Sequence, residues 1–87
     1  MFVRSPDTPS LILSAQQGDR EALDILVKEN MGLVKSIAFR FRDRAETDDL
    51  IQLGVIGLIK AIRGFSFEHE TVLSTYAVPL ITGEIKR

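Results

Sequence analysis

Few side chains in this sequence have the types and spacing that catalysis or metal binding requires. Asp48 and Asp49 are neighbouring carboxylates, but they stand at the start of a predicted helix, where the helix dipole explains them better than acid–base work does. The only histidine, His69, lies between two glutamates, and a metal site would need further ligands placed nearby. With no cysteine there is neither a thiolate nucleophile nor a thiolate ligand. The sequence therefore predicts neither an enzyme nor a metal or cofactor site.

The remaining chemistry is that of binding, and the basic side chains are concentrated in one stretch. Lys35, Arg40, Arg42 and Arg44 form this cluster, which Asp43 dilutes. Most such clusters are solvated faces, and the functional alternative is a surface that follows the backbone of a single nucleic-acid strand. The net charge of −1 over 87 residues argues against an independent duplex binder, which usually carries a basic stripe. If this chain touches nucleic acid, another molecule must supply most of the attraction for phosphate.

The stretch from Asp48 to Arg63 is predicted to form a helix with Thr47 as its N-cap, and it is apolar almost all the way round. It is well short of the ~20 apolar residues that a membrane span needs. A helical wheel separates a core face from an outer arc. The core face consists of Leu50, Ile51, Gly54, Gly57, Leu58, Ala61 and Ile62. The outer arc consists of Asp49, Gln52, Lys60 and Arg63, with Ile56 in its middle and Leu53 and Ile59 at its edges.

Apolar side chains within a polar arc have two explanations. One is a face on which a partner protein docks. The other is a helix that is buried on both sides within its own fold. On the core face, Gly54 and Gly57 are expected to allow a neighbouring helix to approach closely.

Helical periodicity divides the N-terminal part of the chain into short elements. Residues 1–9 hold two prolines and little periodicity, so they are predicted to be a flexible lead-in. Ser10 is predicted to cap a helix over residues 11–17, which Gly18 ends. Asp19 is then expected to cap the next helix.

The pattern loses phase near Asn30, which predicts either two helices with a break there or one long bent helix that reaches about Arg42. A last helix begins near Leu73, and Pro79 either opens its main part after a short turn or bends it. No stretch alternates strongly enough to predict a strand. We therefore expect an all-α domain over residues 10–87, built as a compact bundle of about four helices.

Three motifs, in order along the chain, carry a resemblance to a known family. They are Asp49-Leu50-Ile51-Gln52-x-Gly54-x-Ile56-Gly57-Leu58-x-Lys60-Ala61, the earlier segment from Glu21-Ala22 to Asn30-Met31-Gly32-Leu33-Val34, and the later Ser74-Thr75-Tyr76-Ala77 with Gly83-Glu84-Ile85-Lys86-Arg87. By these motifs the chain closely resembles the core-binding domain, region 2, of a bacterial RNA polymerase sigma factor. The run Tyr76-Ala77-Val78-Pro79 is most similar to the alternative sigma factors of sporulation and general stress.

The resemblance implies a transcription initiation specificity factor whose outer arc docks on core RNA polymerase. The implied partner is the clamp helices, a coiled coil of the largest catalytic subunit. Carried over by position, the contact residues are Asp49, Gln52, Leu53, Val55 and Ile59, and the wheel adds Ile56 at the centre of the arc. Leu53 stands where primary sigma factors commonly have an acidic residue, so a more apolar contact is expected here.

The resemblance also implies that the chain, together with polymerase, captures the melted non-template strand of promoter DNA. Aromatic rings hold a flipped base, because stacking worth about 1–3 kcal/mol per base offsets the stacking lost from the duplex. By position Phe65, Thr71, Tyr76 and Pro79 fall on this pocket, and only Phe65 and Tyr76 keep an aromatic ring, so weaker melting is expected. A second pocket, for a base further downstream, is implied at Asn30. Further DNA contacts are implied at Thr75, Lys86 and Arg87.

The family places such a chain in the cytoplasm, and in the resembled subgroup an anti-sigma protein often covers the same surfaces. The family's last helix continues past the position of Arg87 into residues that recognise the upstream promoter element, so a fragment of a longer protein is expected. The alternative from another class is a helical adaptor that binds a helix of its partner. Such an adaptor need not bind single-stranded promoter DNA.

Overall fold

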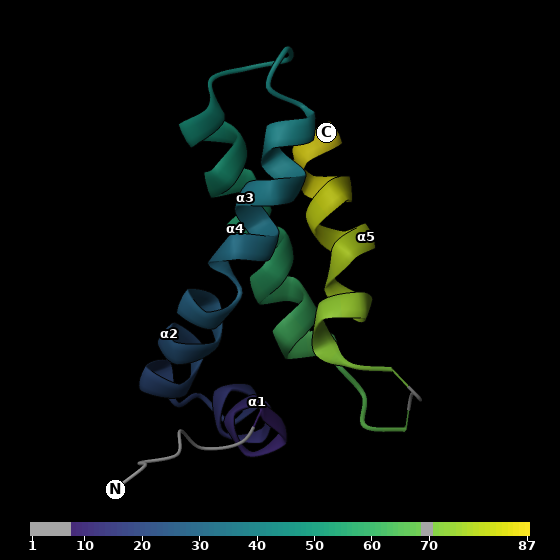
Figure 1. The fold of residues 1–87 in the computed structure, drawn as a ribbon. Helices are drawn as coiled ribbons and strands as arrows, with labels where there is room; N and C mark the ends of the chain where they lie inside the picture. Colours follow the sequence, from purple (N-terminus) through teal and green to yellow (C-terminus); the bar gives the residue numbers. More distant parts are fainter. Residues whose placement is uncertain (1–7, 69–70) are drawn as a thin grey trace, which may run out of the picture.

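Five α-helices follow one another in the computed structural model, which describes residues 8–68 and 71–87 (Figure 1). The helices are α1 (Thr8–Gln16), α2 (Arg20–Glu29), α3 (Met31–Arg40), α4 (Thr47–Gly64) and α5 (Leu73–Lys86). No strand occurs within these described ranges, and the predicted all-α class is confirmed. The expected bundle of about four helices has five, because α2 and α3 are separate helices.

The corner between α1 and α2 follows the predicted turn chemistry. Gly18 has a φ of +102°, the left-handed conformation that glycine adopts without strain after a helix end. The Asp19 carboxylate accepts hydrogen bonds from two main-chain N–H groups in the first turn of α2, at 3.0 and 3.2 Å. The predicted cap at Ser10 is wrong, because α1 begins at Thr8 and Ser10 lies inside it. The rest of the predicted lead-in, residues 1–7, lies outside the described residues.

The break between α2 and α3 falls at Asn30, which decides between the two alternatives that the sequence left open. The main-chain N–H of Asn30 donates to the carbonyls of Leu26 and Val27, at 3.2 and 3.1 Å. Its side-chain Nδ2 donates to the Leu26 carbonyl at 2.8 Å. Asn30 leaves helical geometry, with φ −109° and ψ 10°, and α3 starts as a separate helix (Figure 1).

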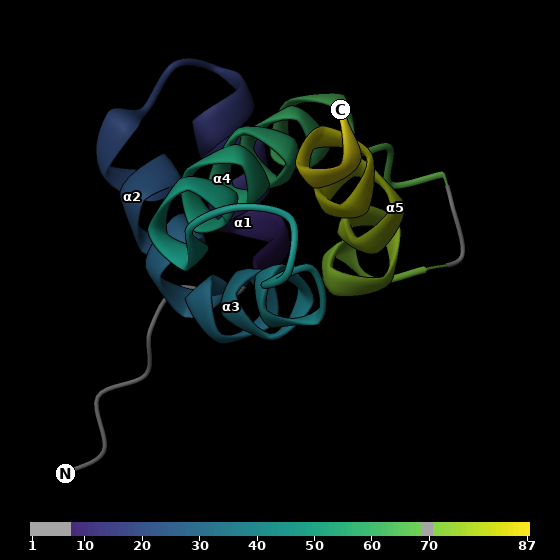
Figure 2. The same ribbon diagram turned by 90° about the horizontal axis from the view of Figure 1, so that it is seen from above.

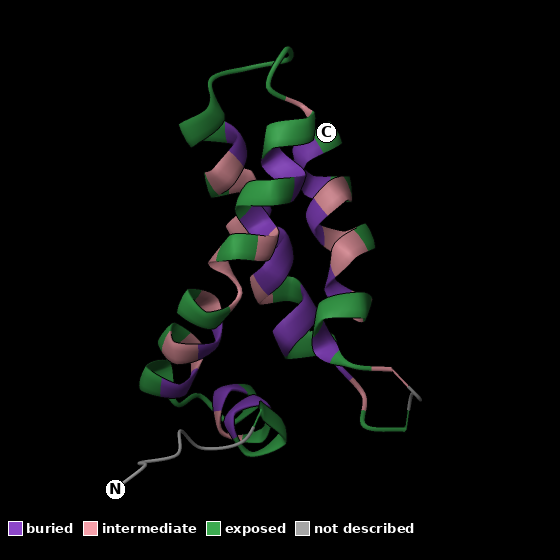
Figure 3. Ribbon diagram, in the orientation of Figure 1, coloured by how far each residue is buried: buried purple, intermediate pink, exposed green. Residues whose placement is uncertain are grey.

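The central helix of the bundle is α4, which packs against each of the other four helices (Figure 2). Its predicted core face is buried apart from Ile51, which is half-buried. The opposite side keeps exposed residues along its length, so the helix is not buried on both sides (Figure 3). The predicted cap at Thr47 is wrong, because Glu46 takes the N-cap position, without a side-chain hydrogen bond, and Thr47 is the first helical residue.

The glycines of α4 let its neighbours approach as closely as predicted. A Cβ atom added at Gly57 would lie 2.5 Å from the carbonyl oxygen of Leu80 and 2.6 Å from the Cα of Ile81. A Cβ atom added at Gly54 would lie 2.8 Å from the Cγ1 of Val34. The backbones of α4 and α5 therefore meet at Gly57, and α3 packs against α4 at Gly54.

The last helix, α5, runs from Leu73 to Lys86 with Pro79 inside it, so the alternative in which Pro79 opens the helix is excluded. Proline has no N–H, which leaves the carbonyl of Thr75 without its helical donor, but Thr75 is exposed and water can bind there.

None of the helices in the described ranges has both the length and the apolar character that a bilayer crossing requires. The largest fully buried side chains are Ile12, Leu26, Val34, Ile37, Leu50, Leu58, Ile62 and Ile81.

Candidate functional site

The first candidate surface is the side of α4 that the bundle leaves open, called here the outer face of α4. It consists of Asp49, Gln52, Leu53, Val55, Ile56 and Ile59. Asp49, Gln52 and Ile56 are exposed, whereas Leu53, Val55 and Ile59 are half-buried. Ile56 is 45% exposed in the middle of this face, although α4 packs against the four other helices on its remaining sides. The face thus offers apolar contact area bordered by an acid and an amide.

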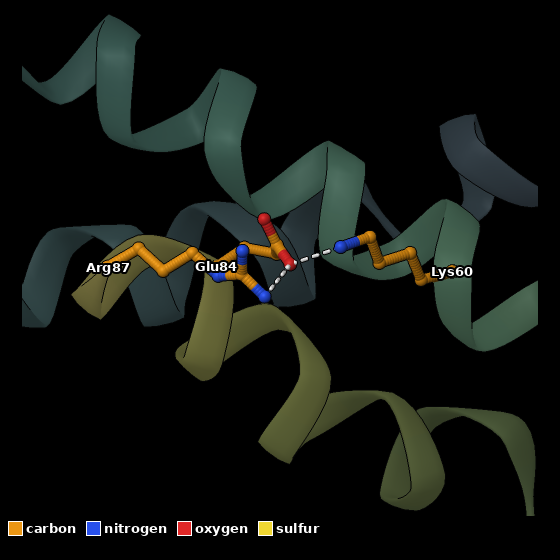
Figure 4. A network of polar contacts seen from close by, with 3 residues as sticks. All are labelled: Lys60, Glu84 and Arg87. Carbon is orange, nitrogen blue, oxygen red and sulfur yellow. Dashed lines mark hydrogen bonds and ion pairs between the residues drawn. The ribbon is translucent and has the colours of Figure 1, made fainter.

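Beside the outer face of α4, an ion-pair network connects α4 to α5 (Figure 4). Lys60 Nζ lies 2.6 Å from Glu84 Oε2, and Arg87 Nη2 lies 3.5 Å from the same oxygen. The hydrogen bond from Lys60 lowers the pKa of Glu84, burial acts in the opposite direction, and the charges of Arg87 and Lys60 lower it further. Glu84 is therefore ionised at neutral pH, where it pairs closely with Lys60 and more loosely with Arg87 at the junction of α4 and α5.

The second candidate surface is an aromatic cluster where the chain leaves α4. The Phe65 ring contacts Phe67 edge-on with a centroid separation of 5.2 Å, and it contacts Tyr76 edge-on at 5.5 Å. The Tyr76 hydroxyl donates to the carbonyl oxygen of Gly64 at 3.3 Å. Phe65 is buried, Tyr76 is half-buried and Phe67 is exposed. The buried Phe65 thus packs against the core on one side and against the exposed ring of Phe67 on the other.

A cleft of about 430 Å³ opens beside this cluster. It lies between the start of α1, the end of α2, the segment after α4 and the start of α5. The cleft brings together Asn30, Phe65 and Thr71, three of the residues predicted to contact DNA, and it adds Phe67. Because Asn30 Nδ2 binds a main-chain carbonyl, the amide is held at the cleft wall. Residues assigned to both of the implied pockets therefore line this cleft, whereas Tyr76 and Pro79 do not.

The other residues predicted to contact DNA lie elsewhere on α5. Thr75 and Pro79 are exposed on this helix, and the Tyr76 ring contacts Phe65, which lines the cleft. Lys86 and Arg87 are exposed at the C-terminal end of α5, away from the segment that follows α4 (Figure 1). The predicted set is therefore divided among the cleft, three residues along α5 and the basic C-terminal end of that helix.

The basic cluster of the sequence has Lys35 in the middle of α3, and its three arginines lie at the end of α3 and in the turn that follows. The Arg42 guanidinium carbon lies 4.2 Å above the centroid of the Phe39 ring, and that of Arg44 lies 5.9 Å from the Phe41 ring. Phe39 is exposed and Phe41 is half-buried.

The described residues hold no group of three or more His, Asp or Glu placed to bind a metal, and His69 lies outside them.

Sequence reasoning missed two polar contacts that shape these surfaces. Gln16, at the end of α1, donates its Nε2 to the carbonyl oxygens of Ile62 and Phe65, both at 2.9 Å. Glu84 pairs with Lys60 across the α4–α5 junction. Both contacts join residues far apart in the sequence, and no local pattern predicts them.

The described residues form an all-helical domain with an open outer face on α4 and a cleft lined by aromatic rings. Residues 26–87 match the family model described as Sigma-70 region 2. The chain belongs to the sigma-70 region 2 family of bacterial sigma factors. The resemblance found in the three motifs is thus confirmed.

Individual relatives support the same family. The chain is 45% identical over 87 residues to the RNA polymerase sigma-F factor of Priestia megaterium, covering 99% of this chain and 34% of that protein. It is 44% identical over 86 residues to the sigma-F factor of Bacillus licheniformis, with 98% and 34% covered. It is 50% identical over 72 residues to the sigma-G factor of Bacillus subtilis, with 82% and 28% covered. The predicted sporulation-type group is confirmed, and the chain spans about a third of the length of the sigma-F relatives.

Proposed function

We propose that this chain acts in transcription initiation, by docking on core RNA polymerase and holding the melted strand of the promoter. The observation that carries the proposal is the open outer face of α4 in a helix that contacts every other helix of the bundle. Family membership supports the proposal, since the sigma-F and sigma-G relatives are named as RNA polymerase factors. The role is that of a non-catalytic factor.

The outer face of α4 fits a helical partner. Asp49, Gln52, Ile56 and Ile59 recur at intervals of three and four residues, so they form one stripe along the helix. A stripe of this kind packs against a coiled coil by burying Ile56 while Asp49 and Gln52 bind polar groups at the rim. The clamp helices of the largest catalytic subunit are the partner that we propose for this stripe.

The cleft beside the aromatic cluster fits an unpaired base. Phe65 is only 8% exposed, so most of its ring supports the cleft wall, whereas Phe67 is 46% exposed and offers more surface for stacking. Asn30 and Thr71 place polar groups in the same cleft, where they can bind the edge of a base. Thr75, Tyr76 and Pro79 extend this surface along α5. Only a few rings line the cleft, so strand capture depends on polymerase and on a favourable promoter sequence.

Further partners follow from the same proposal. The exposed Lys86 and Arg87 are the proposed contacts to phosphates beyond the melted segment. An anti-sigma protein would regulate the chain by covering the outer face of α4 or the cleft. The proposed site of action is the cytoplasm, where bacterial polymerase works.

One titration series tests the proposal. The chain is titrated into an isolated coiled coil of clamp helices, and then, with core polymerase, into a single-stranded promoter oligonucleotide. Ile56→Asp should weaken binding to the coiled coil about tenfold or more, as expected for the centre of an interface. Leu13→Asp is the matched control, because Leu13 is a similarly exposed aliphatic residue at 50% but lies on α1.

The oligonucleotide arm uses Tyr76. Tyr76→Ala should leave binding to the coiled coil unchanged and reduce oligonucleotide capture, whereas Tyr76→Phe, which keeps the ring, should retain capture. Equal binding of Ile56→Asp and Leu13→Asp to the coiled coil would refute the docking face. Normal binding to the coiled coil with no wild-type capture of the oligonucleotide would favour an adaptor that does not bind nucleic acid.

A further inference from the structure

The end of α4 is held by side chains from two other helices. Gln16, the last residue of α1, donates its Nε2 to the carbonyl oxygens of Ile62 and Phe65 at 2.9 Å each, and lies 3.5 Å from that of Arg63. The Tyr76 hydroxyl, from α5, donates to the intervening carbonyl of Gly64 at 3.3 Å. Four consecutive carbonyls, from residue 62 to residue 65, are therefore contacted by α1 and α5.

These contacts supply donors that the helix end lacks. The last four carbonyls of a helix have no intrahelical donor, and many helices satisfy them with a glycine in the left-handed conformation. In the described residues only Gly18 has a positive φ, so Gly64 does not play this part. The chain instead leaves α4 in an extended conformation at Phe65, with φ −63° and ψ 134°. The carboxamide of Gln16 takes the place of a main-chain cap.

The amide geometry fits this task. A carboxamide nitrogen carries two N–H donors, which matches the two contacts of 2.9 Å, and the contact of 3.5 Å to Arg63 is a weak third one. One donor holds the last full turn of α4 through Ile62, and the other holds the first residue outside it, Phe65. The amide thereby fixes the angle at which the chain leaves the helix.

We infer that Gln16 is a positioning residue for the promoter strand: it sets Phe65, and through it the aromatic cluster, for base capture in the cleft. The inference rests on the proposed function and extends it to a residue on α1. Phe65 links the contact to the cleft, because its carbonyl binds Gln16 while its ring contacts Phe67 and Tyr76 and lines the cleft. Without the amide, the exit from α4 keeps the Tyr76 contact to Gly64, but Phe65, on which the other two rings pack, loses the hydrogen bond to its carbonyl.

Four variants separate this role from general stability and from charge. Gln16→Leu removes both donors at nearly constant size, and Gln16→Lys restores a donor that suits the carbonyl end of a helix. Gln17→Leu and Gln17→Lys are the matched controls, because Gln17 is the adjacent exposed glutamine and its side chain makes no hydrogen bond within the described residues. Each variant is reconstituted with core polymerase and titrated with a single-stranded promoter oligonucleotide that carries a fluorescent base analogue. Each is also titrated into the coiled coil of clamp helices.

Gln16→Leu should weaken oligonucleotide capture about three- to tenfold, the range expected for losing such hydrogen bonds, and leave binding to the coiled coil unchanged. Gln16→Lys should capture the oligonucleotide as well as Gln17→Lys does. The near-ultraviolet circular dichroism band of tyrosine gives a second readout, because Tyr76 is the only tyrosine and the chain has no tryptophan. This band should change in Gln16→Leu and stay unchanged in Gln17→Leu.

Wild-type capture by a folded Gln16→Leu would overturn the inference and leave the proposed function standing. If Gln16→Leu does not fold, Gln16→Lys decides: capture equal to that of Gln17→Lys supports the inference, and weaker capture by a folded protein overturns it. Failure of the wild-type chain to capture the oligonucleotide with polymerase would instead refute the proposed function on which the inference rests.

Discussion

The close contact between α4 and α5 at Gly57 predicts a large loss of stability in Gly57→Ala. The new Cβ atom would lie 2.5 Å from the carbonyl oxygen of Leu80, 2.8 Å from its carbonyl carbon and 2.6 Å from the Cα of Ile81. All three neighbours are backbone atoms inside α5, so no side chain can rotate away to relieve the overlap. The two helices must separate, and α4 packs against α5 more extensively than against any other helix.

The size of the loss follows from two opposing terms. Overpacking of a well-packed core costs about 1–3 kcal/mol, and a clash with backbone belongs at the upper end of that range. Replacing a helical glycine by alanine returns about 0.5–1 kcal/mol of conformational entropy. The expected net loss is about 2 kcal/mol of the free energy of unfolding, which lowers the melting temperature of a domain of this size by roughly 8–16 °C.

Thermal and denaturant unfolding, followed by far-ultraviolet circular dichroism, measure this loss. Gly83→Ala is the matched control, because Gly83 lies in α5 and a Cβ atom added there meets no atom within 4 Å. It should stabilise the protein by about 0.4–1 kcal/mol. Equal melting temperatures for Gly57→Ala and the wild type would refute the close contact of α4 and α5.

Two further predictions concern single side chains. Asp19→Ala removes the cap of α2 and should cost about 1 kcal/mol, or roughly 4–8 °C in melting temperature, whereas Asp19→Asn should cost less; equal stability of all three proteins would contradict the cap. Glu84→Gln tests the ion pair with Lys60: because the pKa of Glu84 lies below its ordinary value of 4.5, its contribution is present above that value and is lost as the pH falls through the lowered pKa. The melting temperatures of wild type and Glu84→Gln, measured from neutral pH into the acid range, should therefore converge, and parallel curves would contradict the pairing.

The helices were largely predictable, since a repeat of 3.6 residues is a local property. The inner face of α4 was predicted correctly apart from the half-buried Ile51, and the same wheel placed Ile56 on the open side. Helix starts were less predictable, because caps depend on local dihedral angles as well as on residue type. Asp19 caps α2 as expected. Thr47, the predicted N-cap of α4, is instead the first residue of that helix.

The candidate site was predictable only as a list of residues. The resemblance pointed to Asn30, Phe65 and Thr71, but it assigned Asn30 to a separate pocket. The cleft forms where the start of α1, the end of α2, the segment that follows α4 and the start of α5 come together. The spacing of residues in the sequence does not show which helix ends come together in the fold. It also did not indicate that Phe67 is exposed in the same cleft.

The sequence by itself determined the class of protein, the approximate helices and the side of α4 that the bundle leaves open, because motif order and helical periodicity are carried by neighbouring residues. Only the tertiary structure decided how the exits of these helices are held. Gln16 reaches Ile62 across 46 positions, and Lys60 reaches Glu84 across 24. Contacts at such separations depend on the packing of all five helices at once. For that reason the role of Gln16 as a cap of α4 can be recognised only from the folded structure.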